Sequence, residues 1–289
     1  MIRLIATDMD GTLLNSGHEI SQENIEAIRY AQSQGVTVVI ATGRAFYEAN
    51  MPVKPTGLTV PYICLNGAEI RDEQFNITHT SHLNPEQIEE VTGVLRKYDI
   101  FYQVYTNFGI YTEDKEKDLQ IYLDIAMQAG NEPDEEKIRE GIEKRLEQGT
   151  LKEVDDYSMI YDREGELVMK LLAYTSDHGK LMQAKSELKA FSSLAVSASA
   201  RNNLEITHAD AQKGVALKRI AEQLEIPLSE TMALGDNLND VSMLEVAGFS
   251  VAMENAARET KAIAKYLTDS NEESGVGRAI MKYVKQENE

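Results

Sequence analysis

Cysteine and positive charge are scarce in this sequence. Cys64 is the only cysteine, so an intrachain disulfide is impossible and nothing favours an oxidising compartment. Lysine and arginine number 29 against 48 aspartates and glutamates, which gives a formal net charge of −19. Because such a chain repels polyanions on average, nucleic acid is not expected as a partner. A small anionic ligand would need a local group of cations.

Long apolar runs are also missing, and no stretch approaches the length that is needed to cross a bilayer. A signal peptide is not expected, because Asp8 and Asp10 interrupt the first apolar run before its hydrophobic region could form. We therefore expect a soluble cytoplasmic protein with no membrane partner, either a monomer or a homodimer. The 289 residues, 42% of them hydrophobic, suffice for one large domain or two smaller ones.

The first apolar run is short and ends at two carboxylates. Leu4 to Ala6 is typical of a strand that is buried on both faces, as in a parallel sheet. Asp8 and Asp10 follow it and lie on one side of an extended chain, because side chains alternate with a period of two. Two carboxylates so close repel each other unless a cation binds between or beside them. On its own, the segment is equally typical of a strand followed by an Asp-Gly turn.

Three further apolar runs end in polar residues in the same way. Residues 36–41, 60–65 and 231–234 are predicted strands, and helical patterns separate them. This alternation predicts right-handed βαβ units and an α/β fold with a Rossmann-like parallel sheet. Since the carboxyl ends of parallel strands share one edge of the sheet, the polar residues after the strands should lie together. They are Asp8, Asp10, Thr42, Gly43, Arg44, Asn66, Asp236, Asn239 and Asp240.

The pattern changes in the middle of the chain, where hairpin-like strands mix with helices. Ser158–Tyr161 and Leu167–Tyr174 are among the predicted strands there. We interpret residues 83–190 as an inserted α+β domain and residues 1–82 and 191–289 as the parallel core. In the inserted domain, four side chains are candidates for lining a cleft, although such residues more often serve packing or lie on the surface: Tyr102, Tyr105, Tyr111 and Lys170.

Each polar residue of the core has a simple structural explanation by itself. Thr42 could cap a helix, Lys213 could be a solvated residue at the start of one, and Asp236 could belong to a turn. Together, however, several acids, an amine and a hydroxyl at one sheet edge are the groups that Mg²⁺-assisted phosphoryl transfer requires. Mg²⁺ prefers hard oxygen ligands and keeps several waters, which suits a sparse set of carboxylates.

These segments resemble, in order and spacing, the motifs of the haloacid dehalogenase-like phosphatases, and in particular the Cof-type group of sugar-phosphate phosphatases. The resemblance covers essentially the whole chain, and it is carried by Asp8-Met-Asp-Gly-Thr-Leu, Ala-Thr42-Gly-Arg, Asn66-Gly-Ala, Lys213-Gly and Gly-Asp236-Asn-Leu-Asn-Asp. It implies a cap domain inserted after the third core strand. It also implies a core strand order of 5-4-1-2-3, which puts the first strand and Asp8 at the centre.

The resemblance also implies roles for individual residues. Asp8 corresponds to the nucleophile and Asp10 to the general acid and base, with the backbone carbonyl of Asp10 on the metal. The implied phosphate-binding residues are Met9, Thr42, Gly43, Arg44, Asn66, Lys213 and Asn239, and the implied metal ligands are Asp8, Asp10, Asp236 and Asp240.

We therefore predict a Mg²⁺-dependent phosphatase that hydrolyses small phosphomonoesters, such as sugar phosphates, through an aspartyl phosphate. A phosphotransferase or sugar-phosphate mutase would use the same core and deliver the phosphoryl group to a second hydroxyl instead of water. A non-catalytic phosphosugar-binding protein would be expected to lack Asp8 or Asp10, and the sequence has both.

Overall fold

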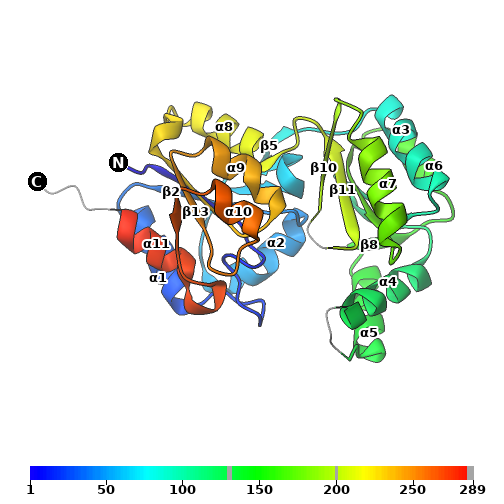
Figure 1. The fold of residues 1–289 in the computed structure, drawn as a ribbon, viewed down its shortest axis with the longest axis horizontal. Helices are drawn as coiled ribbons and strands as arrows, with labels where there is room; N and C mark the ends of the chain where they lie inside the picture. The colour runs from blue at the N-terminus through cyan, green and yellow to red at the C-terminus, as the bar shows by residue number, and fades with distance from the viewer. Residues whose placement is uncertain (129–131, 199–200, 285–289) are drawn as a thin grey trace, which may run out of the picture. The chain divides into compact units, whose positions relative to one another are not determined.

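The structure is a computed structural model that describes residues 1–128, 132–198 and 201–284. It divides into two compact units, which we call the core unit (residues 1–81 and 210–289) and the inserted unit (residues 82–209). The fold is α/β, with a Rossmann-like sheet in the core unit and a separate sheet in the insertion (Figure 1). None of the helices within the described residues is long and apolar enough to cross a membrane.

The core unit is built around one eight-stranded sheet. Its strands are β1 (Leu4–Thr7), β2 (Thr37–Ala41), β3 (Tyr62–Cys64), β4 (Glu69–Arg71), β5 (Ile77–Thr80), β12 (Thr231–Gly235), β13 (Phe249–Ala252) and β14 (Tyr266–Leu267). Its α-helices are α1 (Gln22–Ser33), α2 (Phe46–Val53), α8 (Lys213–Gln223), α9 (Val241–Val246), α10 (Arg258–Ile263) and α11 (Gly275–Tyr283). Short 3₁₀ turns span Lys54–Thr56, Leu65–Gly67, Leu228–Glu230, Leu238–Asp240 and Asn271–Glu273.

The strand order of this sheet is β14-β13-β12-β1-β2-β3-β4-β5. The first six strands of that order are parallel, while β4 and β5 form antiparallel pairs at one edge. The predicted order of the five core strands is therefore confirmed, with β1 between β12 and β2. Thr7 pairs with both Leu234 and Ile40, so these three strands end at the same level and Asp8 begins the central loop.

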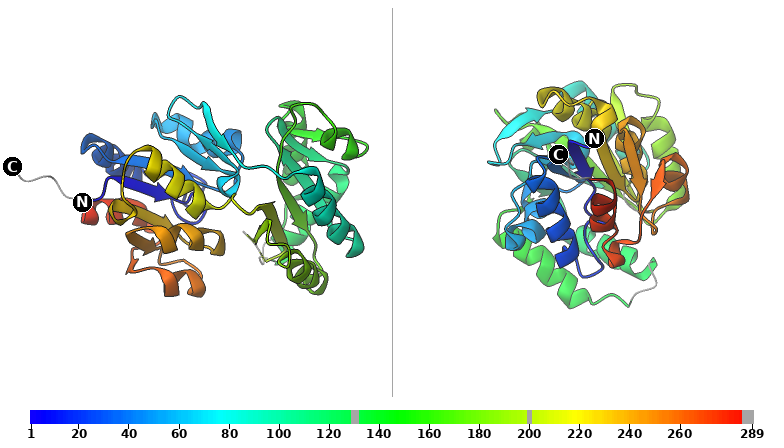
Figure 2. Two further views of the ribbon diagram at one scale, coloured as in Figure 1. Left: turned by 90° about the horizontal axis from the view of Figure 1, so that it is seen from above. Right: turned by 90° about the vertical axis from the view of Figure 1, so that its left-hand side faces the viewer.

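Helices cover both faces of the core sheet (Figures 1 and 2). On one face α1 packs against α11, and the Gly277 N–H donates to Asn24 Oδ1 at 2.7 Å. On the other face Leu4 and Ala6 of β1 join an apolar cluster with α8 and α9. Every residue of β1 is buried, which explains why the strand is apolar on both faces and why polar residues begin only where it ends.

The inserted unit has a six-stranded sheet of its own, in the order β10-β11-β9-β6-β7-β8. The strands are β6 (Phe101–Thr106), β7 (Gly109–Thr112), β8 (Leu151–Glu153), β9 (Val168–Tyr174), β10 (Leu194–Ser197) and β11 (Asn203–His208). The helices are α3 (Pro85–Lys97), α4 (Lys115–Gln128), α5 (Glu135–Glu147), α6 (Ser158–Tyr161) and α7 (His178–Leu188). An apolar cluster joins one face of this sheet to α3, α6 and α7.

The inserted unit extends to Ala209, so the predicted boundary after residue 190 is too early. The segment after it forms β10 and β11, and β11 pairs with β9 inside the sheet of the insertion. Leu204 and Ile206 enter the apolar cluster, while Glu205 between them faces the other side. This alternation was the local signal for a strand. Residues 285–289, also assigned to the core from the sequence, lie outside the described residues.

A second prediction that the structure corrects concerns Ser158–Tyr161, which is the short helix α6 and not a strand. The Asp156 carboxylate accepts the Ser158 N–H at 2.7 Å and so begins a helical turn. Tyr157 and Ile160, three residues apart, are both buried in the apolar cluster. A spacing of three residues fits one face of a helix. In a segment of only four residues, however, the apolar pattern of the sequence cannot distinguish a helix from a strand.

Candidate active site

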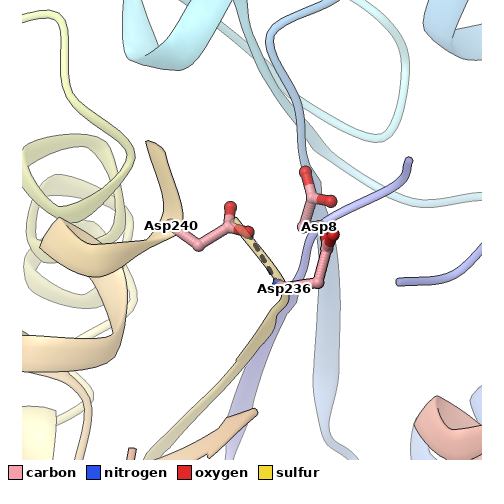
Figure 3. Close-up of side chains that lie close together, drawn as sticks. All are labelled: Asp8, Asp236 and Asp240. Atoms are coloured by element: carbon pink, nitrogen blue, oxygen red, sulfur yellow. Dashed lines mark hydrogen bonds between the residues drawn. The ribbon is translucent and has the colours of Figure 1, made fainter. Parts of the chain in front are cut away.

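The ends of the parallel strands bring acidic side chains together from distant parts of the chain. Asp8 follows β1, and Asp236 and Asp240 follow β12. One carboxylate oxygen of each lies within 4.8 Å of one from each of the others (Figure 3). Asp8 and Asp240 are buried, and Asp236 is partly exposed. The sequence prediction that these residues share one edge of the sheet is therefore correct.

Lys213 provides the positive charge inside this group. Its Nζ donates to Asp8 Oδ1 at 2.5 Å and to Asp240 Oδ1 at 2.7 Å, and the side chain is fully buried at the start of α8. Burial alone would lower the pKa of Lys213, but Asp240 and Asp8 outweigh it and raise the pKa above its ordinary value. The ammonium therefore stays protonated, and Lys213 is not the solvated residue that was one alternative from the sequence.

Asp240 is held by donors on both of its oxygens. While Oδ1 accepts from Lys213, Oδ2 accepts the backbone N–H groups of Asp236 at 2.9 Å and of Asn237 at 3.0 Å. Figure 3 shows the bond from the Asp236 N–H to Asp240 as a dashed line. Asp240 thus fixes both the loop after β12 and the position of the Lys213 ammonium.

Burial and the neighbouring Asp240 raise the pKa of Asp8 and of Asp236. Burial raises the pKa of Asp8 well above its ordinary value, and Asp240 raises it further, against the opposing effect of Lys213. Burial and Asp240 likewise raise the pKa of Asp236 to about 6. Two carboxylates contact one ammonium and a third lies beside them, so the ionised group has an excess of negative charge that a bound cation would neutralise. The chemistry of these oxygen donors fits a hard divalent metal ion.

Gly11 keeps space open beside Asp236. Its φ of +74° belongs to the left-handed region, and a Cβ built on it would lie 2.5 Å from Asp236 Oδ2. Thr12, the next residue, donates from Oγ1 to Asp236 Oδ1 at 2.8 Å and is fully buried. The sequence patterns predicted no role for Thr12, which stands in the segment Asp8-Met-Asp-Gly-Thr-Leu. A buried hydroxyl directly after an Asp-x-Asp-Gly segment was the signal that could have indicated one.

Asp10 lies in a different environment from Asp8. Its side chain is about half exposed, and its carboxylate pairs with the Arg44 guanidinium through two hydrogen bonds. Arg44 Nε donates to Asp10 Oδ2 at 2.8 Å, and Nη2 donates to Oδ1. The Asp10 carboxylate is thus turned to Arg44 and is not one of the three carboxylates grouped above.

The remaining predicted residues surround the same strand ends. Thr42 is buried after β2, and its Oγ1 accepts the Arg44 N–H at 3.1 Å, with Gly43 between them. Asn66 is buried with a φ of +58°, and its Oδ1 accepts from Asn239 Nδ2 at 3.3 Å. The site thus combines residues from the ends of β1, β2, β3 and β12.

Met9 can contribute to the site only through its backbone. Its side chain is fully buried, so the sulfur and methylenes belong to the core of the fold. Its carbonyl accepts the N–H groups of Leu13 at 3.0 Å and Leu14 at 2.9 Å, which closes the turn after β1. The Met9 amide therefore has a fixed position between Asp8 and Asp10.

The four cleft candidates of the inserted unit divide between two faces of its sheet. Tyr102 and Tyr111 belong to the apolar side, where the Tyr157 hydroxyl donates to the Tyr102 carbonyl at 2.6 Å. Tyr105 and Lys170 lie on the other face, with Lys170 Nζ 4.4 Å from the centre of the Tyr105 ring. Lys170 Nζ is also 3.7 Å from Glu205 Oε1, and both side chains are buried.

Comparisons with known proteins agree with this geometry. The sequence model of a family described as haloacid dehalogenase-like hydrolase matches residues 5–280. The chain is 35% identical over 285 residues to phosphatase YwpJ of Bacillus subtilis, covering 98% of this chain and 100% of that protein. It is 36% identical over 280 residues to 5-amino-6-(5-phospho-D-ribitylamino)uracil phosphatase YwtE of the same organism, covering 96% and 97%. A solved haloacid dehalogenase-like hydrolase from B. subtilis superposes with a TM-score of 0.87 at 34% identity, covering 98% and 100%.

Proposed function

The chain belongs to the haloacid dehalogenase-like hydrolases and is a phosphatase, and we propose that it hydrolyses small phosphomonoesters through an aspartyl phosphate on Asp8, with Mg²⁺ in the site. The observation that carries this proposal is the contact of Asp8 with Lys213, beside Asp236. A nucleophilic carboxylate, a cation for phosphoryl oxygens and a second acid for a metal are thereby combined in one place.

In the first step, a carboxylate oxygen of Asp8 attacks phosphorus and the bond from phosphorus to the ester oxygen breaks. Asp10 gives a proton to the departing alkoxide. In the second step, Asp10 takes a proton from water, the water oxygen attacks phosphorus, and the bond from phosphorus to Asp8 breaks. Inorganic phosphate leaves, and Asp8 is again a carboxylate. Two easier displacements thus replace one difficult displacement.

Mg²⁺ would be held by the carboxylates of Asp8 and Asp236 and by the backbone carbonyl of Asp10. Two observations support this assignment: the carboxylate oxygens lie close together, and Gly11 leaves room beside Asp236. When bound, the ion neutralises repulsion between the carboxylate and the phosphate dianion. Asp240 belongs to the same group of carboxylates and would complete the metal site, either directly or through a water, while its other contacts hold Lys213 and the loop after β12.

Lys213 and Thr42 would bind the phosphoryl oxygens. An ammonium has three protons, and Lys213 gives two of them to Asp8 and Asp240, so the third is left for a phosphoryl oxygen. Asn66, Asn239 and the backbone amides of Met9 and Gly43 complete the proposed set of phosphate-binding groups. Negative charge shifts between the phosphoryl oxygens during the transfer, and these groups would stabilise it. Preorganised donors contribute most to the rate when they face the charge that develops in the transition state.

The substrate is a small phosphorylated metabolite, for which sugar phosphates and the ribitylaminouracil phosphate named for YwtE are the first candidates. The inserted unit selects among such compounds. Nucleic acid is not expected as a partner, because a net charge of −19 repels polyanions on average. We expect a monomer or a homodimer.

A panel of purified phosphomonoesters, ranked by kcat/KM for phosphate release with Mg²⁺, tests the proposal. Each compound is assayed with and without an excess of a second sugar as acceptor. A phosphatase releases stoichiometric phosphate in both cases. If phosphate release falls and a new phosphorylated sugar forms, the enzyme is a phosphotransferase or mutase. If no compound on the panel is hydrolysed, the proposed function is wrong.

A further inference from the structure

Arg44 contacts Asp10, although the sequence assigned it to phosphate binding. Two of its nitrogens donate to the two oxygens of the Asp10 carboxylate, with Nε to Oδ2 at 2.8 Å. This bidentate arrangement fixes the plane of a carboxylate as well as its position, and a single hydrogen bond cannot do both. With two of its donors committed to Asp10, the guanidinium is oriented toward that carboxylate.

The backbone of Arg44 is fixed from two sides. Its N–H donates to Thr42 Oγ1 at 3.1 Å, and its carbonyl accepts the Leu65 N–H at 3.0 Å. Thr42 follows β2 and Leu65 follows β3, so two buried strands hold the base of the arginine. Because the Arg44 backbone is fixed in this way, its guanidinium reaches Asp10 from a defined position.

Asp10 itself has little else to orient it. Its side chain is 49% exposed, compared with 7% for Asp8. A half-exposed aspartate without a partner samples several rotamers, and proton transfer requires one of them. The two bonds to Arg44 leave a second lone pair on each Asp10 oxygen, so the carboxylate can still exchange a proton while it is held.

We propose that Arg44 is a positioning residue, which holds the Asp10 carboxylate in the orientation for proton transfer and does not bind the phosphoryl group. This inference rests on the proposed function, because it needs Asp10 to act as the proton shuttle. It changes the role that the sequence predicted for Arg44, and it makes the two residues one functional pair.

Arg44→Gln removes the charge and one of the two paired donors. We expect kcat for an alkyl phosphate to fall about 10- to 100-fold, which is the usual result of a misplaced catalytic group. The KM and the inhibition constant of inorganic phosphate should stay within about threefold, because groups that bind phosphate remain in place. An increase in both constants with unchanged kcat would instead show that Arg44 binds phosphate, and would overturn the inference.

A double-mutant cycle with Asp10→Asn separates positioning from a general structural effect. If Arg44 acts through Asp10, Arg44→Gln should lower kcat no further in the Asp10→Asn background. Losses that multiply in the double variant would overturn the inference while leaving the proposed function intact. If the wild-type enzyme has no phosphatase activity, both the proposed function and the inference about Arg44 are wrong. The phosphate-release panel detects that case separately.

Two further variants protect the test against misfolding. Arg44→Lys keeps the charge but loses the planar pair of donors, so its kcat should lie between those of wild type and Arg44→Gln. Arg278→Gln is the matched control, since Arg278 forms an exposed ion pair with Asp269 at 3.0 Å and should leave kcat unchanged. Circular dichroism melts of all variants check folding, and an Arg44→Lys enzyme as fast as wild type would show that charge alone is sufficient, which would contradict the inference.

Chemical rescue gives an independent measurement. Arg44 borders a cavity of about 450 Å³ that His18, Glu48, Met51 and Pro52 also line, so a small cation has access to its position. In Arg44→Ala, guanidinium chloride at millimolar concentration should restore part of kcat, and sodium chloride should not. Rescue should be absent in Arg44→Ala combined with Asp10→Asn. Equal rescue with and without the Asp10 carboxylate would contradict a role through Asp10.

Discussion

Asp8 and Asp10 lie two residues apart after the same strand, and each is paired with a cation. The two pairs differ in how far they are exposed to solvent. Asp8 and its partner Lys213 are enclosed, with side-chain exposures of 7% and 0%. Asp10 and Arg44 are open to solvent at 49% and 26%. The backbone after β1 turns sharply at Gly11, which has a positive φ, and the two carboxylates point to different neighbours.

This difference decides what each pair contributes. Removing one partner of a buried ion pair typically costs about 3–5 kcal/mol, because an uncompensated charge stays behind. An exposed pair typically contributes about 0–1 kcal/mol. The buried pair of Asp8 and Lys213 therefore contributes to the stability of the fold as well as to the site. The exposed pair of Asp10 and Arg44 contributes little to stability, and its proposed role is proton transfer. Changes at the two pairs should have different effects on stability.

The largest effect is expected from Asp8→Asn, which keeps the shape of the side chain and removes the proposed nucleophile. Turnover should fall on the order of 10⁴-fold or more, since a covalent step cannot start. Acid quench followed by mass spectrometry should detect no phosphoenzyme in this variant. A phosphorylated species in Asp8→Asn would show that another residue is the nucleophile.

Metal removal tests the buried group in the wild-type enzyme. Without a divalent ion, the negative charges of Asp8 and Asp236 are less well compensated, since Lys213 contacts Asp8 and Asp240. A bound metal is typically worth several kcal/mol of transition-state stabilisation. EDTA treatment should therefore lower kcat on the order of 10³-fold, and added Mg²⁺ should restore it. The metal assignment is wrong if the EDTA-treated enzyme keeps its original rate on the same phosphomonoester.

Asp10→Asn tests the exposed pair. Loss of a proton shuttle should lower kcat for alkyl phosphates about 10²- to 10⁴-fold. Aryl phosphates need little protonation on leaving, so their first step should be less affected and phosphate should accumulate on Asp8. The thermal midpoint should change little, because the pair is half exposed. Equal losses for alkyl and aryl substrates, without a trapped intermediate, would contradict the role of Asp10.

Lys213→Met should produce a smaller loss of activity and a larger loss of stability than Asp10→Asn. Removing one preorganised donor typically costs about 10²- to 10³-fold in kcat. The buried carboxylates of Asp8 and Asp240 lose their ammonium, so unfolding in metal-free buffer should become easier by about 3–5 kcal/mol. Lys218→Met is the matched control, since Lys218 is exposed on the same helix. Denaturant unfolding of both variants makes the comparison, and equal stabilities would show that Lys213 does not compensate the buried acids.

The alternation of apolar runs and helical patterns predicted the parallel sheet and the edge where the acids gather. These features are local, since a buried strand is apolar on both faces and a polar cluster marks its end. The strand order was implied by the resemblance to a known family. Thr12 and the end of the inserted unit were missed. Thr12 acts on Asp236, which is 224 residues away, and β11 is defined by its pairing with β9.

What the sequence determined by itself is the set of side chains at the strand ends, because period and composition place them there. Only the tertiary structure decided how those side chains are paired. Lys213 meets Asp8 across 205 residues of sequence, and Arg44 meets Asp10 across 34. Such pairings leave no periodic pattern in the chain, because they depend on how separate strands and loops pack. The contrast between an enclosed carboxylate and an exposed one, two residues apart, follows from that packing.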